Sequence, residues 1–142
     1  MTKIPSFCLL TIPGRPQAKG RPRFVHGHAY TPERTRNAEE VAQGLMRQAC
    51  SVPLDGPLEL ILSFSFRRPN AWSKARRQAI DDGYEEPYPG TPDLENLPKL
   101  IQDAGNRILY HDDAQIVKLE ARKVYGAENE TLLNLFPWSA ND

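Results

Sequence analysis

The sequence has few of the residues that bind zinc or form disulfide frameworks: two cysteines and three histidines among 142 residues. Cys8 and Cys50 lie far apart and neither adjoins a histidine, so we expect two reduced, buried thiols with no nucleophilic role. Because cysteines and histidines form no cluster, a zinc site is not expected.

Long hydrophobic runs are also missing. The apolar stretch at residues 7–12 is stopped by Pro13, and it is too short for a membrane span or a signal peptide. Hydrophobic residues make up 39% and charged residues 25% of the chain, as in ordinary globular domains. We therefore expect a cytoplasmic protein without membrane contact, folded as one domain over residues 1–142.

The formal net charge is zero, but the charges are unevenly distributed. Residues 15–23 hold four basic side chains and residues 67–77 hold five, with no acid in either run, whereas residues 81–95 hold six acids and no base. A single run is usually a solvated face. Two basic runs beside an acidic one favour a nucleic acid gripped by its phosphates. The expected backbone contacts are Arg15, Lys19, Arg21, Arg23, Arg67, Arg68 and Lys74.

Alternation, helical spacing and turn residues predict the secondary structure. Strands are expected at residues 7–12, 58–66, 115–125 and 132–136, with a hairpin around Gly27. Helices are expected at residues 31–50, from Trp72-Ser73 onward, and from about Asn96. This combination predicts an α+β fold in which a small mixed sheet of four or five strands packs against two main helices.

Residues 92–124 carry the acidic side chains best suited to chemistry. Asp93 and Glu95 are two apart and point to the same side of an extended segment. In the helix that follows, Lys99 and Asp103 share a polar stripe. The pair Asp112-Asp113 then precedes a strand. Carboxylates converging from a helix start and a strand start make an oxygen-rich site of the kind that magnesium takes.

Each of these residues also has an ordinary structural interpretation. Asp93 would cap a helix, Lys99 would pair with Glu95 and Asp103, and Asp112-Asp113 would form a turn. Taken singly these interpretations are favoured. The spacing of the complete set favours a functional site.

The set resembles the signature of RusA-type Holliday-junction resolvases. The matching residues are Asp-Leu-Glu-Asn-Leu-Pro-Lys at 93–99, Asp-Ala at 103–104 and Asp-Asp-Ala-Gln-Ile at 112–116. The resemblance also includes Ile-Pro-Gly-Arg-Pro at 12–16, Lys-Gly-Arg-Pro-Arg-Phe at 19–24, Tyr-Thr-Pro at 30–32 and Trp-Ser-Lys at 72–74. One position departs from the family pattern: its second acid is usually aspartate, and here it is Glu95, one methylene longer.

The resemblance implies a magnesium-dependent endodeoxyribonuclease that resolves four-way junctions by paired nicks in opposed strands, in recombination and repair of phage or prophage DNA. It implies that Asp93, Glu95 and Asp113 hold the magnesium and that Lys99 assists the phosphoryl chemistry. It also implies a homodimer, since two equivalent sites match a two-fold substrate. No small-molecule cofactor is expected.

Other functions remain open at this stage. The chain could be a metal nuclease for other branched DNA, or a branched-DNA-binding protein that lost its metal through the change at Glu95. Pro92-Asp93 followed by Glu120 resembles a PD-(D/E)xK nuclease, but Arg122 stands where that pattern has lysine. A structural dimer whose acids and bases only pair with each other is the remaining alternative.

Overall fold

The computed structural model describes residues 7–21 and 23–140, apart from the side chain of Arg23. Its strands are β1 (Cys8–Pro13), β2 (Arg23–Val25), β3 (His28–Tyr30), β4 (Leu58–Arg67), β5 (Ile116–Gly126) and β6 (Glu130–Pro137). Its helices are α1 (Glu33–Ala49), α2 (Lys74–Asp81) and α3 (Leu97–Gly105), with short 3-10 helices η1 (Leu94–Asn96) and η2 (Asp113–Gln115). Each predicted strand and helix is present, with small shifts at the ends.

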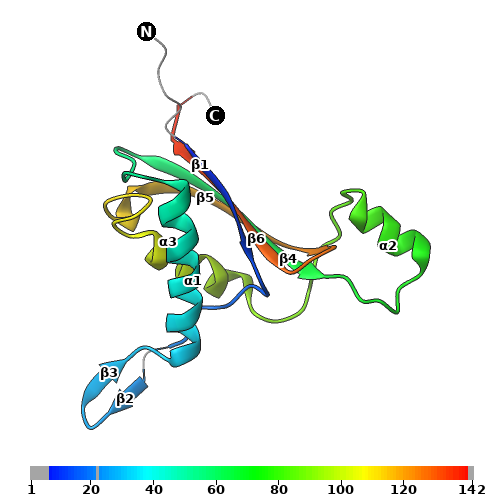
Figure 1. Cartoon of the computed structure of the whole chain (residues 1–142), viewed down its shortest axis with the longest axis horizontal. Coiled ribbons are helices and arrows are strands. Elements are labelled where there is room, and N and C mark those ends of the chain that lie inside the picture. Colours follow the sequence, from blue (N-terminus) through cyan, green and yellow to red (C-terminus); the bar gives the residue numbers. More distant parts are fainter. Residues whose placement is uncertain (1–6, 22, 141–142) are drawn as a thin grey trace.

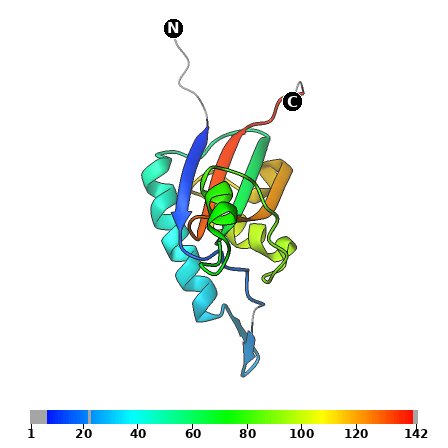
Figure 2. The ribbon, with the colours of Figure 1, turned by 90° about the vertical axis from the view of Figure 1, so that its right-hand side faces the viewer.

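Four strands form one mixed sheet in the order β1-β6-β4-β5 (Figures 1 and 2). Strand β6 is antiparallel to both β1 and β4, whereas β4 and β5 are parallel. The alternation in β4 places five side chains on the helix-covered face, each at most 1% exposed: Leu58, Leu60, Leu62, Phe64 and Phe66. The predicted α+β fold, a single small domain with a mixed sheet, is therefore confirmed.

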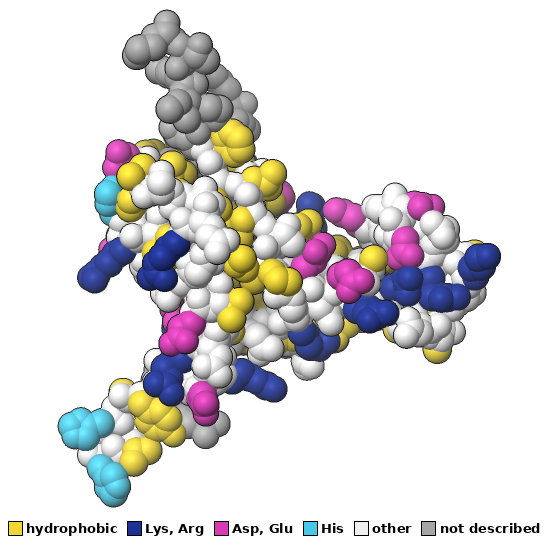
Figure 3. All heavy atoms as spheres, in the orientation of Figure 1, with side chains coloured by type: hydrophobic (Ala, Val, Ile, Leu, Met, Phe, Trp, Pro, Cys, Tyr) yellow, Lys and Arg dark blue, Asp and Glu magenta, His cyan; other side chains and the backbone are white. Residues whose placement is uncertain are grey.

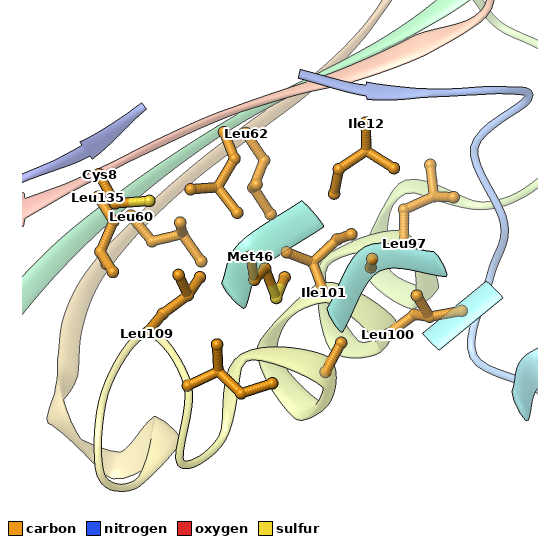
Figure 4. Close-up of a cluster of buried hydrophobic side chains, with 14 of the residues drawn as sticks. Cys8, Ile12, Met46, Leu60, Leu62, Leu97, Leu100, Ile101, Leu109 and Leu135 are labelled. Carbon is orange, nitrogen blue, oxygen red and sulfur yellow. The ribbon is translucent and has the colours of Figure 1, made fainter. Parts of the chain in front are cut away.

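The core lies between this face of the sheet and the helices α1 and α3. Met46 of α1 is fully buried and lies among leucines of the sheet and residues of α3 such as Ile101 (Figure 4). Helix α3 has an apolar stripe at helical spacing, and all four of its residues are buried: Leu97, Leu100, Ile101 and Ala104. Packing of this stripe fixes the rotation of α3, so its polar stripe with Lys99 faces away from the core.

Two segments project from this body. Helix α2 lies on an arm at one side, and the β2–β3 hairpin extends beyond the N-terminal end of α1 (Figures 1 and 2). Ser73 caps α2, because its side chain accepts a hydrogen bond from the amide of Arg76. The hairpin turn is formed by His26 and Gly27, with φ values of 51° and 79°, as its two-residue length requires.

Strand β5 differs in detail from its predicted alternation. Leu119 and Ala121 lie beside Leu60 and Leu62, on the helix-covered face. Val117 falls at a shift in register between β4 and β5, outside the residues paired with β4, and its side chain is 57% exposed. A bulge of this kind leaves one residue out of the ladder and turns its side chain away.

The two cysteines are free, as predicted. Cys8 is buried in the core, and this burial, followed by the nearby Cys50, raises the pKa of its thiol to about 11. Cys50 is only half-buried, so the expected burial is confirmed for one of the two. No helix within the described residues is long and apolar enough to cross a membrane.

Candidate active site

Asp93 and Glu95 lie just before the N-terminal end of α3. Asp93 occupies the N-cap position of η1, but its side chain makes no capping hydrogen bond. Glu95 lies within η1, and both side chains are exposed. The structural interpretation of Asp93 as a capping side chain is therefore wrong, and both carboxylates are accessible to a ligand.

Lys99 lies on the outer face of α3 and is exposed. Within the described part of the chain its ammonium forms no ion pair, so the predicted pairing with Glu95 and Asp103 is not seen. Asp103 instead forms an ion pair with Lys19, at 3.1 Å. The positive charge of Lys99 is therefore not neutralised by the acidic residues nearby.

Asp113 lies beside the C-terminal end of α3, where Asn106 positions it. The Asn106 side chain accepts a hydrogen bond from the amide of Asp113, at 2.7 Å, and its Nδ2 lies 3.4 Å from the Asp113 carboxylate. Gln115 holds the same turn by accepting from the amides of His111 and Asp112. The sequence gives no signal of this positioning role of Asn106, because the contact depends on the turn at Asp113 folding back against the end of α3.

Negative charge is concentrated around Asp113. Partial burial, followed by Asp112 and Asp103, raises the pKa of the Asp113 carboxyl, against the lowering effect of its hydrogen bond with Asn106. A bound cation would favour the ionised form of a carboxyl group whose burial and acidic neighbours disfavour that form. This end of α3 therefore has the electrostatic character of a cation site.

Lys19 links the acidic region to α1. Its ammonium lies 2.5 Å from Glu39 of α1 and 3.1 Å from Asp103 of α3. Burial disfavours the charged form, but the hydrogen bonds to these carboxylates outweigh it and raise the pKa of Lys19. Its backbone amide also donates to the carbonyl of Asn96, next to Glu95. Lys19 thus joins α1 to α3 and to the backbone next to Glu95.

The three predicted metal ligands come from segments on either side of α3 in the chain. Asp93 and Glu95 precede α3 at η1, and Asp113 follows it in η2, held by the side chain of Asn106. Among the described residues, no group of three aspartate, glutamate, histidine or cysteine side chains is arranged to hold a metal ion. The donors fit a hard divalent cation in kind, since all are carboxylates. Their grouping on one ion stays a prediction.

The backbone leading to Asp93 is supported by two cations that sequence reasoning did not place here. Lys123 of β5 donates to the carbonyls of Gly90 and Pro92, at 2.5 and 2.8 Å. Arg15 donates to the carbonyl of Thr91, at 3.1 Å. The sequence does contain one indication of the role of Lys123. It shares a face of β5 with Leu119 and Ala121, beside the core face of β4, and lysine is unusual at such a position.

Replacing Lys123 with methionine is expected to lower the free energy of unfolding by about 1–3 kcal/mol, because two carbonyls lose a charged donor. If Asp93 holds a metal ion, as the resemblance implies, DNA cleavage by the variant should fall about tenfold or more, as when a group that orients a metal ligand is removed. Urea denaturation and junction-cleavage rates would measure the two effects.

The matched control is Arg122→Met on the neighbouring position of β5. Arg122 pairs with Glu85 at 3.5 Å, with both side chains about half exposed, and such pairs contribute at most about 1 kcal/mol. Equal effects of the two substitutions would show that Lys123 does not position the loop.

The predicted DNA contacts separate into paired and unpaired cations. Arg68 makes two hydrogen bonds of 2.9 Å to Asp81, and Lys19 and Arg15 are engaged as described above. Three exposed side chains have no ion pair within the described residues: Arg21, Arg67 and Lys74. The side chain of Arg23 lies outside the described residues.

Trp72, on the arm, packs against a cation and against the aromatic side chains at the end of the sheet. The Arg76 guanidinium lies 3.3 Å from the centre of the Trp72 ring and also pairs with Glu86. Trp72 packs edge-on against Tyr125, which packs in the same way against Tyr88. One face of the Trp72 ring is therefore covered by Arg76, and the ring also packs against Tyr125.

The fold and these residues define a class of protein. A small α+β domain with accessible carboxylates, an unpaired lysine and unpaired surface cations suits an enzyme that acts on nucleic acid. A family model described as "Endodeoxyribonuclease RusA" matches residues 13–135. The chain belongs to this family, as its signature residues predicted.

One curated relative is similar over most of its length. The chain is 29% identical over 125 residues to "Uncharacterized protein YqaN" of Bacillus subtilis (strain 168), covering 83% of this chain and 87% of the relative. Family membership supports an endodeoxyribonuclease of the Holliday-junction-resolvase kind, which acts on branched DNA. Nucleases of this kind typically need a divalent metal.

Proposed function

We propose that this chain is a magnesium-dependent endodeoxyribonuclease that resolves four-way DNA junctions by paired nicks in opposed strands. The observation that supports it best is the concentration of negative charge at Asp113, beside Asp103 and Asp112, in a chain of the RusA family. The proposed setting is DNA recombination and repair in a phage or prophage.

In this proposal Asp93, Glu95 and Asp113 hold the metal. The bound cation would lower the pKa of a water and stabilise the leaving oxygen. Their carboxylate chemistry suits magnesium, and Glu95 keeps the charge of the more usual aspartate. Lys99, which is exposed and unpaired in the described residues, would neutralise charge on the scissile phosphate.

The remaining cations divide between two roles. Arg21, Arg67 and Lys74 are exposed and would contact the DNA backbone, as would Arg23 if the sequence-based prediction holds. Lys19, Arg15 and Arg68, which were predicted as DNA contacts, are held by protein groups and would act mainly by fixing the site and the arm.

A homodimer is part of the proposal. Two nicks placed symmetrically across a four-way junction require two equivalent sites, and a two-fold dimer supplies them. The support for a dimer is the two-fold symmetry of the proposed reaction.

The experiment is cleavage of a synthetic four-way junction beside a linear duplex of the same sequence, in magnesium and in calcium. We expect paired nicks in the junction alone, and only in magnesium. Binding of the junction without any cut would instead support a branched-DNA-binding protein without catalysis. Equal cleavage of forks and flaps would support a nuclease for branched DNA in general.

A further inference from the structure

We propose that the β2–β3 hairpin, residues 23–30, inserts at the branch point of the DNA and stacks Phe24 against an unstacked base. This inference rests on the proposed function and adds a base-binding element to it. The hairpin pairs Arg23 with Tyr30, Phe24 with Ala29 and Val25 with His28. It projects away from the sheet and from α3 (Figures 1 and 2).

The hairpin exposes apolar side chains on both of its faces. Phe24 is 75% exposed and, with Ala29, lies on one face of the ribbon. Val25 and Tyr30 are 48% and 44% exposed and lie on the other, because successive residues of a strand alternate. Figure 3 shows hydrophobic side chains beside histidines at the lower left, where the hairpin lies. An isolated two-stranded hairpin is marginally stable in water, so such surface indicates a ligand.

The charge around the hairpin favours a polyanion as that ligand. Residues 12–32 contain no aspartate or glutamate. Arg21, at the base of the hairpin, is exposed and unpaired among the described residues. Aromatic side chains together with cations hold unpaired bases in many proteins, and apolar side chains inserted between base pairs unstack them. A four-way junction offers bases of this kind at its branch point.

The base of the hairpin is fixed next to the candidate active site. The amide of Lys19 donates to the carbonyl of Asn96, at 3.0 Å, and its ammonium joins α1 to α3. The amide of Gly20 donates to Thr35 Oγ1 at 2.9 Å, and a Cβ at Gly20 would lie only 2.7 Å from that oxygen. These contacts anchor residues 19 and 20, shortly before the hairpin, beside α3, so a base stacked on Phe24 would be tethered to the candidate active site.

The test compares Phe24→Ala and Phe24→Trp with the wild type. Binding of a four-way junction and of a linear duplex would be measured by fluorescence anisotropy in calcium. We expect Phe24→Ala to weaken junction binding about tenfold, in the range found when a stacked base loses its aromatic partner, and to leave duplex binding unchanged. Phe24→Trp should retain junction binding, and the melting temperature should not change because Phe24 is largely exposed.

The matched control is Phe7→Ala. Phe7 is 54% exposed and directly precedes β1, at the opposite end of the molecule from the hairpin (Figure 1). Its loss should leave binding of both DNAs unchanged.

Each of the following outcomes would overturn the inference. Phe24→Ala binding the junction as tightly as wild type would remove the stacking role, and an equal loss on duplex would make Phe24 a general DNA contact. If Phe24→Ala differed from the wild type in oligomeric state, measured by sedimentation, the hairpin would be a protein-binding element instead. If the wild-type protein bound neither DNA, both the proposed function and this inference would fail. If Phe24→Ala cleaved the junction normally and bound it with unchanged affinity, only this inference would be refuted.

Discussion

Replacing Asp113 with asparagine is expected to abolish cleavage of a four-way junction while binding survives. The substitution keeps the shape of the side chain and its contact with Asn106, but removes the charge that would hold the metal. Metal ions supply several kcal/mol of transition-state stabilisation, so the rate should fall about a thousandfold or more. Single-turnover cleavage in magnesium and anisotropy in calcium would measure the two properties.

Asp112→Asn is the matched control for this prediction. Asp112 adjoins Asp113, and its carboxylate caps η2 by accepting from the amide of Ala114 at 2.9 Å. Asparagine is an equally good capping residue, so cleavage should change little. Loss of activity in both variants would mean that the turn, rather than the Asp113 carboxylate, is required.

Replacing Lys99 with methionine is expected to lower the cleavage rate about a hundredfold without weakening junction binding. Lys99 is exposed beside η1 and forms no ion pair among the described residues, so its charge is available to the scissile phosphate. Removing one group that stabilises developing charge typically costs about 100- to 1,000-fold in rate. Because the side chain is exposed, the unfolding free energy should hardly change.

Lys74→Met provides the comparison for a cation with a different proposed role. Lys74 is exposed on the arm at the start of α2 and would contact the DNA backbone. Its loss should weaken binding of all DNAs uniformly and reduce the salt dependence of binding by about one unit of slope. If Lys99→Met gave this same pattern, Lys99 would be a phosphate contact with no part in the reaction.

The parts of the fold that depend on local pattern could be predicted from the sequence. Alternation over residues 58–66 identified the central strand, and the spacing of Leu97, Leu100, Ile101 and Ala104 identified the buried side of α3. Both patterns follow from the period of the backbone and need no knowledge of what packs against them. The bulge at Val117 could not be predicted, because it arises from the register between β4 and β5.

The candidate site was predicted in composition but not in arrangement. The spacing of Asp93, Lys99 and Asp113 was enough to indicate the RusA family, which the family match confirms. It gave no information on Asn106, whose role depends on a turn folding back against the end of α3. That the acids converge on one metal ion stays a prediction; the structure shows which elements carry them, η1 for Glu95 and η2 for Asp113.

By itself, the sequence determined the strands, the helices, the buried faces and the family, since each of these is encoded in residues close together in the chain. Only the tertiary structure decided which charges are available. Lys19 pairs with Asp103 and Lys123 supports residues 90–92 because packing brings together segments that are distant in sequence. A cation's freedom to bind a phosphate depends on such neighbours, so Arg21, Arg67 and Lys74 were distinguished from Arg68 and Lys19 only once the chain had folded.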